Sequence, residues 1–127
     1  MIINMEKVIL FNMDNDNIRS IYNICSKMRI GVIAADSEQN VSMVEDIMKL
    51  PLYKGGIVNR KGLASPTTEE SLLLMCGLTD KHMDRLLASL RNSHIQPDYK
   101  AVLTPSNKKW TVTKLLAHMA FEKNSYN

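Results

Sequence analysis

Cysteine and aromatic residues are scarce in this chain. Cysteine occurs only twice, at Cys25 and Cys76, and Phe, Trp and Tyr together make up 6% of the 127 residues. Two thiols this far apart form neither a C-x-x-C pair nor a set of zinc ligands, and they do not indicate a disulfide framework. Because both lie inside apolar runs, we expect two buried, reduced cysteines and no bound metal or cofactor.

Long hydrophobic runs and targeting segments are also missing. Residues 1–7 lack the charged start, the apolar stretch and the cleavage site of a secretory signal. No apolar run approaches the roughly 20 residues that a membrane-spanning helix needs. Together with the two separated thiols, these absences predict a cytoplasmic protein without a membrane partner.

Charge of one sign does not accumulate, since no run of basic residues exceeds two. The net charge is +3, but residues 1–53 hold five basic and seven acidic side chains, whereas residues 54–127 hold eleven and six. This asymmetry leaves nucleic-acid binding through the basic second half as an alternative function. We do not favour it, because the aromatic platform on which single strands stack is missing. The basic residues concerned are Lys54, Arg60, Lys61, Lys100, Lys108 and Lys109.

Hydrophobic residues make up 45% of the chain, within the range of ordinary globular proteins. A chain of 127 residues fits one domain, residues 1–127. Its core must be mainly aliphatic, with the nine methionines filling gaps between other side chains.

Apolar periodicity divides the chain into two β-α-β-α units, residues 6–50 and 71–123, joined by a loop at 51–70. Continuous apolar runs predict four strands, and apolar residues at steps of three and four predict a helix after each strand. Pro51 should end the second helix. The loop could hold a short hairpin or an edge strand around Gly55-Gly56, or it could be a mobile flap. The predicted strands cover residues 7–12, 32–35, 71–76 and 100–103, and polar helix-capping clusters stand at 14–17, 36–37, 79–80 and 104–107.

The two units indicate an internal repeat. The helical stripe Ile18, Ile21, Tyr22 and Cys25 falls on Met83, Leu86, Leu87 and Leu90 at a constant offset of 65. After an insertion in the second unit, Val41 falls on Trp110 at an offset of 69. The evidence is a matching order and period, because few residues are identical.

Strands that are apolar throughout predict a sheet covered on both faces, and alternating strands and helices predict parallel pairing. The expected fold is therefore α/β, with a small four-stranded, mostly parallel sheet made by the two units. The alternative is a ferredoxin-like α+β sandwich, βαββαβ, with the third strand beside the first. The pattern leaves the strand order open.

One segment resembles a known family. Residues Lys100 to Trp110 match the pattern K-A-x-x-T-x-x-N-x-x-W at Lys100, Thr104, Asn107 and Trp110. This pattern is similar to the signature of a bacterial domain family that is known only as a domain of unknown function. The resemblance covers roughly residues 70–123, and it implies no activity.

The residues of this segment admit two interpretations. In the structural one, Thr104, Ser106 and Asn107 cap the last helix, and Trp110 begins its buried stripe. In the functional one, the start of that helix binds an anion or a carboxylate at the carboxyl edge of the sheet. The candidate ligand-binding residues are Lys100, Thr104, Ser106, Asn107, Lys108 and Trp110.

No catalytic motif is present, and His82, His94 and His118 share no metal-ligand spacing. The favoured function is a non-catalytic α/β module that binds another protein, a second copy of itself in a homodimer, or a small anionic ligand. The alternative is a small enzyme with a polar site at the carboxyl edge of the sheet. Its residues would be Asp14, Asp36, Thr104 and Asn107.

Overall fold

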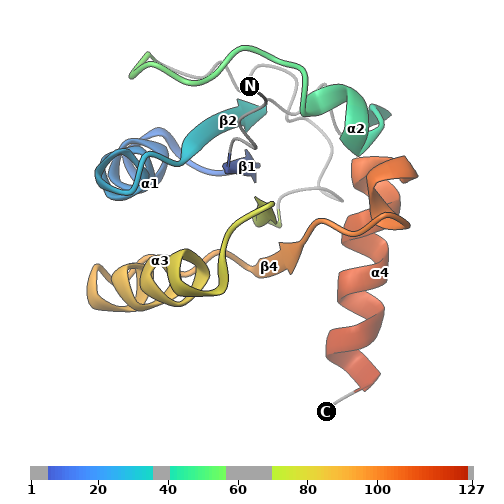
Figure 1. The fold of residues 1–127 in the computed structure, drawn as a ribbon. Helices are drawn as coiled ribbons and strands as arrows, with labels where there is room; N and C mark the ends of the chain where they lie inside the picture. The colour runs from blue at the N-terminus through green and yellow to red at the C-terminus, as the bar shows by residue number, and fades with distance from the viewer. Residues whose placement is uncertain (1–5, 36–40, 57–69, 126–127) are drawn as a thin grey trace.

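The computed structural model describes residues 6–35, 41–56 and 70–125 of the chain (Figure 1). They form four strands, four α-helices and one short 3-10 helix. In chain order these are β1 (Lys7–Phe11), α1 (Asn15–Lys27), β2 (Gly31–Ala35), α2 (Val44–Ile47), β3 (Leu72–Cys76), α3 (Asp80–Asn92), β4 (Tyr99–Val102), η3 (Asn107–Lys109) and α4 (Val112–Ser125).

The sheet has the strand order β2-β1-β3-β4. β1 pairs with β2, and β3 with β4, in parallel, whereas the central pair β1 and β3 is antiparallel, with Ile9 opposite Leu74. The α/β class and the four strands are confirmed, and the sheet is mixed, with one antiparallel pair. The ferredoxin-like alternative placed the third strand correctly beside the first. It is wrong for the outer strands, because each β-α-β unit is unsplit and β2 lies beside β1.

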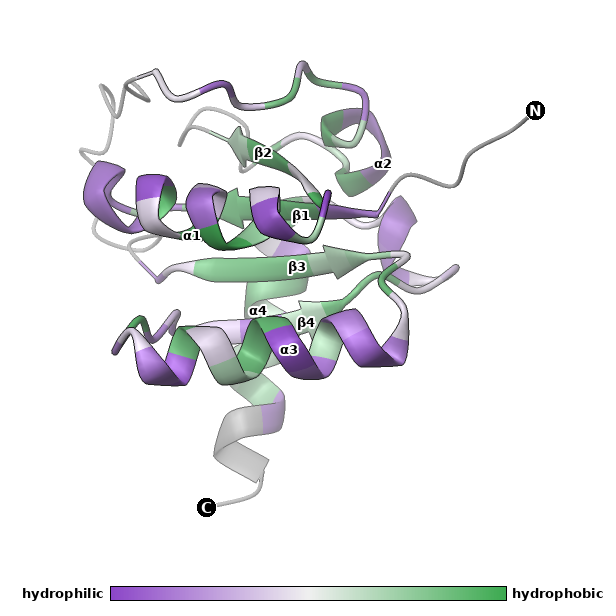
Figure 2. Ribbon diagram, turned by 60° about the vertical axis from the view of Figure 1, so that its left-hand side comes forward, coloured by the Kyte–Doolittle hydropathy of each residue, from purple (hydrophilic) through white to green (hydrophobic). Residues whose placement is uncertain are grey.

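Helices cover both faces of the sheet (Figure 1). α1 and α3 lie on one face, and α2 and α4 lie on the other. Side chains alternate along each strand, so that Val8 and Leu10 face α1 and α3 while Ile9 and Phe11 face the opposite core. Burial on both faces explains why the central strands β1 and β3 are almost entirely apolar, as the hydropathy colouring shows (Figure 2).

The two β-α-β units match position by position. α1 and α3 each have 13 residues, and the side chains that cap their first turns are Asp14 and Thr79, which are 65 positions apart. Just after β1 and β3, Asn12 and Gly77 both have a positive φ, again at an offset of 65. The two units are therefore related by an approximate twofold axis between β1 and β3.

The second helices meet on the same axis. Met43 forms an isolated bridge with Thr111, Val44 N donates to Trp110 O at 2.9 Å, and Val112 N donates to Ser42 O at 3.1 Å. In these pairs, equivalent residues of the two units are 68 positions apart, so Ser42 is the equivalent of Trp110. The predicted match of Val41 with Trp110 is wrong, and Val41 is 78% exposed.

α2 is shorter than the sequence predicts. The sequence predicted a second helix that ends at Pro51, but the helix covers only Val44–Ile47. The bridge to Thr111 holds Met43 in an extended conformation, so the helix cannot begin earlier. The predicted cap at 36–37 lies outside the described residues.

The described part of the 51–70 loop, residues 51–56, forms neither helix nor strand. It runs past β2, and Tyr53 N donates to Val32 O at 2.6 Å (Figure 1). The predicted hairpin at Gly55-Gly56 would need residues beyond 56, which lie outside the described residues. Among the described helices, none combines the length and the apolar character needed to cross a membrane.

Candidate binding groove

A groove lies between the outer edge of β4 and the helix α4, and we call it the β4–α4 groove. Its volume is about 330 Å³. The strand and the segment after it form one side, and one face of α4 forms the other. The residues that line it are Lys100, Ala101, Val102, Thr104, Asn107, Trp110, Leu115, His118, Met119 and Glu122.

The groove exists because α4 is long. The bridge between Met43 and Thr111 ties the start of α4 to the middle of the molecule. From there the 14-residue helix runs about 21 Å, whereas β3 and β4 together are about 10 Å wide. α4 therefore crosses its half of the sheet and continues past β4, as Figure 1 shows.

The strand side of the groove is a sheet edge. Tyr99 N donates to Ser71 O and Leu103 N donates to Met75 O, both at 2.9 Å, so alternate residues of β4 point their backbone groups at β3. The backbone N–H and C=O groups of Lys100 and Val102 consequently point away from β3, into the groove. Val102 is 43% exposed, which is high for a strand residue of this small sheet.

Asn107 closes part of this edge. Its Oδ1 accepts from Thr104 N at 2.8 Å, and its Nδ2 donates to Val102 O at 3.0 Å. In return, Asn107 N donates to the Thr104 hydroxyl at 3.0 Å. The side-chain amide thus makes the two hydrogen bonds that the N–H and C=O of one residue in a fifth, parallel strand would make, and only the Lys100 end of the edge stays open.

The helix side combines an apolar surface with charge. The rings of Trp110 and His118 meet edge to face, with centroids 5.0 Å apart, and Lys114 Nζ lies 4.9 Å from the centroid of Trp110. His118 Nε2 lies 2.9 Å from Glu122 Oε1. Within the described part of the chain, Lys100 is exposed and has no carboxylate partner.

Four of the six predicted ligand-binding residues line the β4–α4 groove: Lys100, Thr104, Asn107 and Trp110. Ser106 and Lys108 do not line it. The predicted caps of the last helix are wrong, because Asn107 starts η3 and α4 begins only at Val112.

The cap of α4 is Thr111, whose hydroxyl accepts from Lys114 N at 3.1 Å. Because the start of α4 packs against Ser42 and Met43, the anion site predicted at this helix start is not formed there. The α4 side of the groove was missed, although His118 and Glu122 have the i, i+4 spacing that puts them on one helix face.

The polar residues of the enzyme alternative are not brought together. β1 and β3 are antiparallel, so the strands of the first unit and those of the second unit have their carboxyl ends at opposite ends of the sheet. Asp14 follows β1 and caps α1, whereas Thr104 and Asn107 follow β4 at the other end. Asp36 lies outside the described residues.

Other titratable groups serve the fold. Burial raises the pKa of the Cys25 and Cys76 thiols to about 12, with Lys7 opposing this slightly at Cys76. A hydrogen bond from the Tyr99 hydroxyl to the Glu70 carboxylate, together with desolvation and nearby negative charge, raises the pKa of Tyr99 to about 12. Within residues 6–35, 41–56 and 70–125, no three His, Cys, Asp or Glu side chains gather to hold a metal ion.

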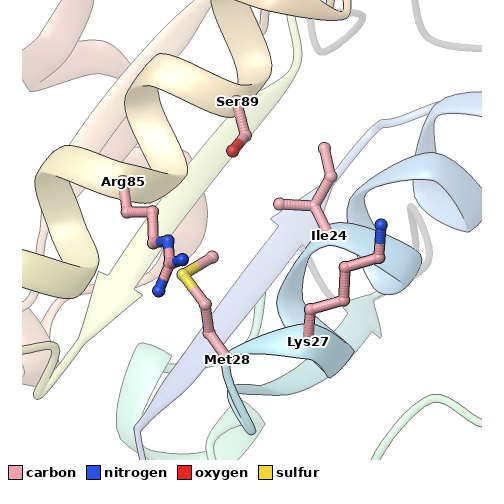
Figure 3. A pocket seen from close by; sticks show the side chains of 5 residues that line it. All are labelled: Ile24, Lys27, Met28, Arg85 and Ser89. Carbon is pink, nitrogen blue, oxygen red and sulfur yellow. The ribbon is translucent and has the colours of Figure 1, made fainter.

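A second hollow, of about 160 Å³, lies between α1 and α3. It is lined by Ile24, Lys27, Met28, Arg85 and Ser89, and Figure 3 shows Arg85 of α3 beside Met28, the residue that caps the end of α1. Small-molecule sites usually exceed about 300 Å³. The hollow is a gap between two packed helices, and the β4–α4 groove is the larger candidate.

Comparisons with known proteins add a family for the second unit. No curated protein and no solved structure matches the chain significantly. A family model described as a domain of unknown function, DUF3783, matches residues 71–126. This range begins just before β3 and takes in α3, β4 and α4, including all ten residues that line the groove. The similarity to this family therefore concerns the second unit, residues 71–126.

Proposed function

We propose that this protein is a non-catalytic binding module and that the β4–α4 groove is its recognition site for an anionic partner. One observation carries the proposal. An open sheet edge, an exposed lysine without a carboxylate partner among the described residues, and an apolar helix face meet in one groove. Binding sites combine a mainly apolar lining with a few polar groups that orient the ligand, and this groove has that composition.

The charge around the groove supports an anionic partner. Lys100 lines it and Lys114 lies on Trp110 at its rim, while Lys109 is exposed on the neighbouring η3. Glu122 is the acidic residue in the lining, and it is paired with His118. Basic residues at a rim raise the association rate of an acidic partner and orient it.

The signature segment from Lys100 to Trp110 shapes this site in our proposal. Lys100 supplies the charge, Thr104 and Asn107 close the strand edge, and Trp110 supplies the aromatic wall. The position-by-position match of the two units supports the internal repeat as their origin. The buried thiols on opposite faces of the sheet support a reducing, cytoplasmic location.

A partner protein is the first candidate, because an edge strand beside an overhanging helix suits a polypeptide. A small anionic ligand is the second, because about 330 Å³ is within the range of small-molecule sites. Self-association through β4 is less favoured, since Asn107 leaves only a short edge for a second copy.

The test selects random peptides displayed on phage against the full chain. Selected clones are then measured on two charge-reversed variants, Lys100→Glu in the groove and Lys81→Glu on exposed α3 as the matched control. We expect clones to lose binding to Lys100→Glu and to keep binding to Lys81→Glu. Clones that bind both variants equally well would contradict the proposed site.

The small-ligand candidate is tested by thermal shift with citrate and with inorganic phosphate on the same proteins. A ligand at about 100 times its Kd adds about 2.7 kcal/mol to the free energy of unfolding. A shift that Lys100→Glu removes would favour a small anion over a peptide. Light scattering tests self-association, which requires a mass above 14.4 kDa.

A further inference from the structure

Building on the proposed function, we propose that the occupant of the β4–α4 groove is an extended, acidic peptide segment that adds to the outer edge of β4 at Lys100. The molecule contains its own example of such an addition. At the opposite edge of the sheet, the chain lays residues 50–53 along the outer side of β2.

The contacts at the β2 edge show how such a segment is held. Tyr53 N donates to the outward carbonyl of Val32 at 2.6 Å. Leu50 and Leu52 pack against the core on the α2 side, and Tyr53 packs on the other core, with its ring edge to face on Tyr22. One backbone hydrogen bond and alternating side chains thus fix an extended segment on a sheet edge.

Lys100 is the equivalent of Val32. The first residues of the outer strands, Gly31 and Tyr99, make matching hydrogen bonds, to Glu6 O and to Ser71 O, which lie 65 positions apart. The next residues are Val32 and Lys100, and both turn their carbonyls away from the sheet. Among the described residues, no backbone N–H donates to the Lys100 carbonyl.

The two edges differ because the helices that follow β2 and β4 differ in length. α2 has four residues, and the chain then turns back along β2. α4 has 14 residues and continues outward past β4. Residues 50–53 lie along the outer edge of β2, and the β4–α4 groove is the equivalent place along the outer edge of β4.

The groove restricts the segment that fits. Asn107 closes the edge beyond Val102, so backbone pairing is confined to the region of Lys100. Over this region, the half-buried Trp110 and Met119 offer an apolar surface for a side chain of the segment. The occupant therefore needs a short extended stretch with an apolar or aromatic residue beside the pairing N–H.

Charge distinguishes a partner from a second copy of this chain. The chain's own edge segment is flanked by Lys49 and Lys54, and the groove has Lys100 and Lys114. Segment 50–53 of another copy would bring like charges together. A partner segment flanked by Asp or Glu would pair with the same lysines.

The test uses the full chain, labelled with ¹⁵N, and a synthetic peptide with the sequence of residues 49–56 in which Asp and Glu replace the two lysines. Two controls accompany it: the unmodified lysine peptide, and the acidic peptide with an N-methylated tyrosine. N-methylation removes the N–H that would donate to the Lys100 carbonyl. The emission of Trp110, the single tryptophan, gives the affinity, and amide shifts give the position.

We expect amide shifts at residues 100–102 and 115–122, with affinity about fivefold lower for the N-methylated peptide, the size of one net hydrogen bond. The lysine peptide should bind more weakly still. Equal affinity of the methylated peptide would overturn strand addition, as would shifts centred on Val32 and Tyr53, where the chain's own segment lies.

The two proposals fail separately. If the acidic peptide does not bind, but the phage selection returns clones that depend on Lys100, strand addition at this register is wrong and the proposed site stands. If neither the peptide nor any selected clone depends on Lys100, the proposed site is wrong as well.

Discussion

The two edges of the sheet start from equivalent strands and end differently. β2 and β4 each pair in parallel with a central strand, and their first residues make equivalent hydrogen bonds. At β2 the chain covers its own edge with residues 50–53, and at β4 a side-chain amide covers one end and leaves a groove at the other. A sheet edge needs cover, and this molecule uses two forms of it.

A single position illustrates the difference. Gly31 begins β2, and a Cβ placed on it would lie 3.0 Å from Leu52 Cδ2. Tyr99 begins β4 at the equivalent place, and its own side chain is buried in the same core. Leu52 of the returning segment fills the core space beside Gly31, whereas the Tyr99 side chain itself fills the equivalent space at β4. The core beside β4 is therefore filled without a covering segment, and the edge of β4 stays accessible.

Opening the β4 edge completely should have the largest effect. Asn107→Ala removes both side-chain hydrogen bonds and leaves Thr104 N and Val102 O without their partner. We expect the free energy of unfolding to fall by about 2 kcal/mol. The bared edge should also pair between molecules, which light scattering would detect as a concentration-dependent mass above 14.4 kDa.

Asn107→Asp is the matched control for this experiment. A carboxylate still accepts from Thr104 N but no longer donates to Val102 O. The buried carboxylate would also face the Val102 carbonyl oxygen, so its loss of stability should be at least as large as that of Asn107→Ala. If Asn107→Ala stays monomeric and loses less than about 0.5 kcal/mol, the amide does not protect the edge.

Crowding the β2 edge should have the next largest effect. The side chain introduced by Gly31→Val meets Leu52, so we expect a loss of about 1.5 kcal/mol in urea unfolding. The double variant with Leu52→Ala should lose less than the sum of the two single variants, because the smaller side chain makes room. Additive losses would show that Leu52 does not occupy the site equivalent to the Tyr99 ring.

Alkaline pH should weaken the β4 side through Tyr99, which has no counterpart at Gly31. The folded protein holds the Tyr99 proton up to a pKa of about 12, above the ordinary value of 10. The unfolded chain therefore releases this proton first, and stability falls as the pH rises from about 10 to about 12. Urea unfolding in this range should show a shallower fall for Tyr99→Phe.

Part of the loss of stability at alkaline pH should persist in Tyr99→Phe. The Cys25 and Cys76 thiols also have a pKa raised by burial, from 9 to about 12. Their contribution to stability is lost over the same rise in pH, because the unfolded thiols ionise first. A slope that Tyr99→Phe leaves unchanged would show that the hydrogen bond to Glu70 does not hold the tyrosine proton.

The smallest effect on stability is expected for Lys100→Glu, because Lys100 is exposed and has no carboxylate partner among the described residues. We expect a change within about 0.5 kcal/mol in urea unfolding. A much larger loss would mean that Lys100 supports the fold, and its use as a binding probe would then fail. Circular dichroism gives the control that the variant is folded.

Local sequence patterns predicted most of the secondary structure. The four strands lie within one residue of the predicted ones, because continuous apolar runs follow from burial on both faces. α1 and α3 were predicted through their stripes and their caps, Asp14 and Thr79, which act over three residues. The start of α2 could not be predicted, since a bridge from Met43 to Thr111 decides where the helix begins.

No groove was predicted, but four of the residues that line it had been singled out from the sequence. Lys100, Thr104, Asn107 and Trp110 lie within eleven residues, so one segment carries half of the site. The role of Asn107 was assigned to the wrong structure, because a polar residue before a helix pattern resembles a cap. The side chain of Asn107 instead bonds the carbonyl of Val102, five residues earlier on the outer edge of β4. That this carbonyl lies on an edge is recognisable only when the strand order is known.

By itself, the sequence determined the α/β class, the two β-α-β units and the position of each strand, because these depend on the period of apolar residues along a few turns or pleats. Only the tertiary structure decided that the units pair through antiparallel β1 and β3, so that the carboxyl ends of their strands lie at opposite ends of the sheet. It also decided which edge is covered, since one hydrogen bond from Tyr53 to Val32 joins residues 21 positions apart. Contacts of this kind depend on the packing of distant segments, and no local pattern of residues encodes them.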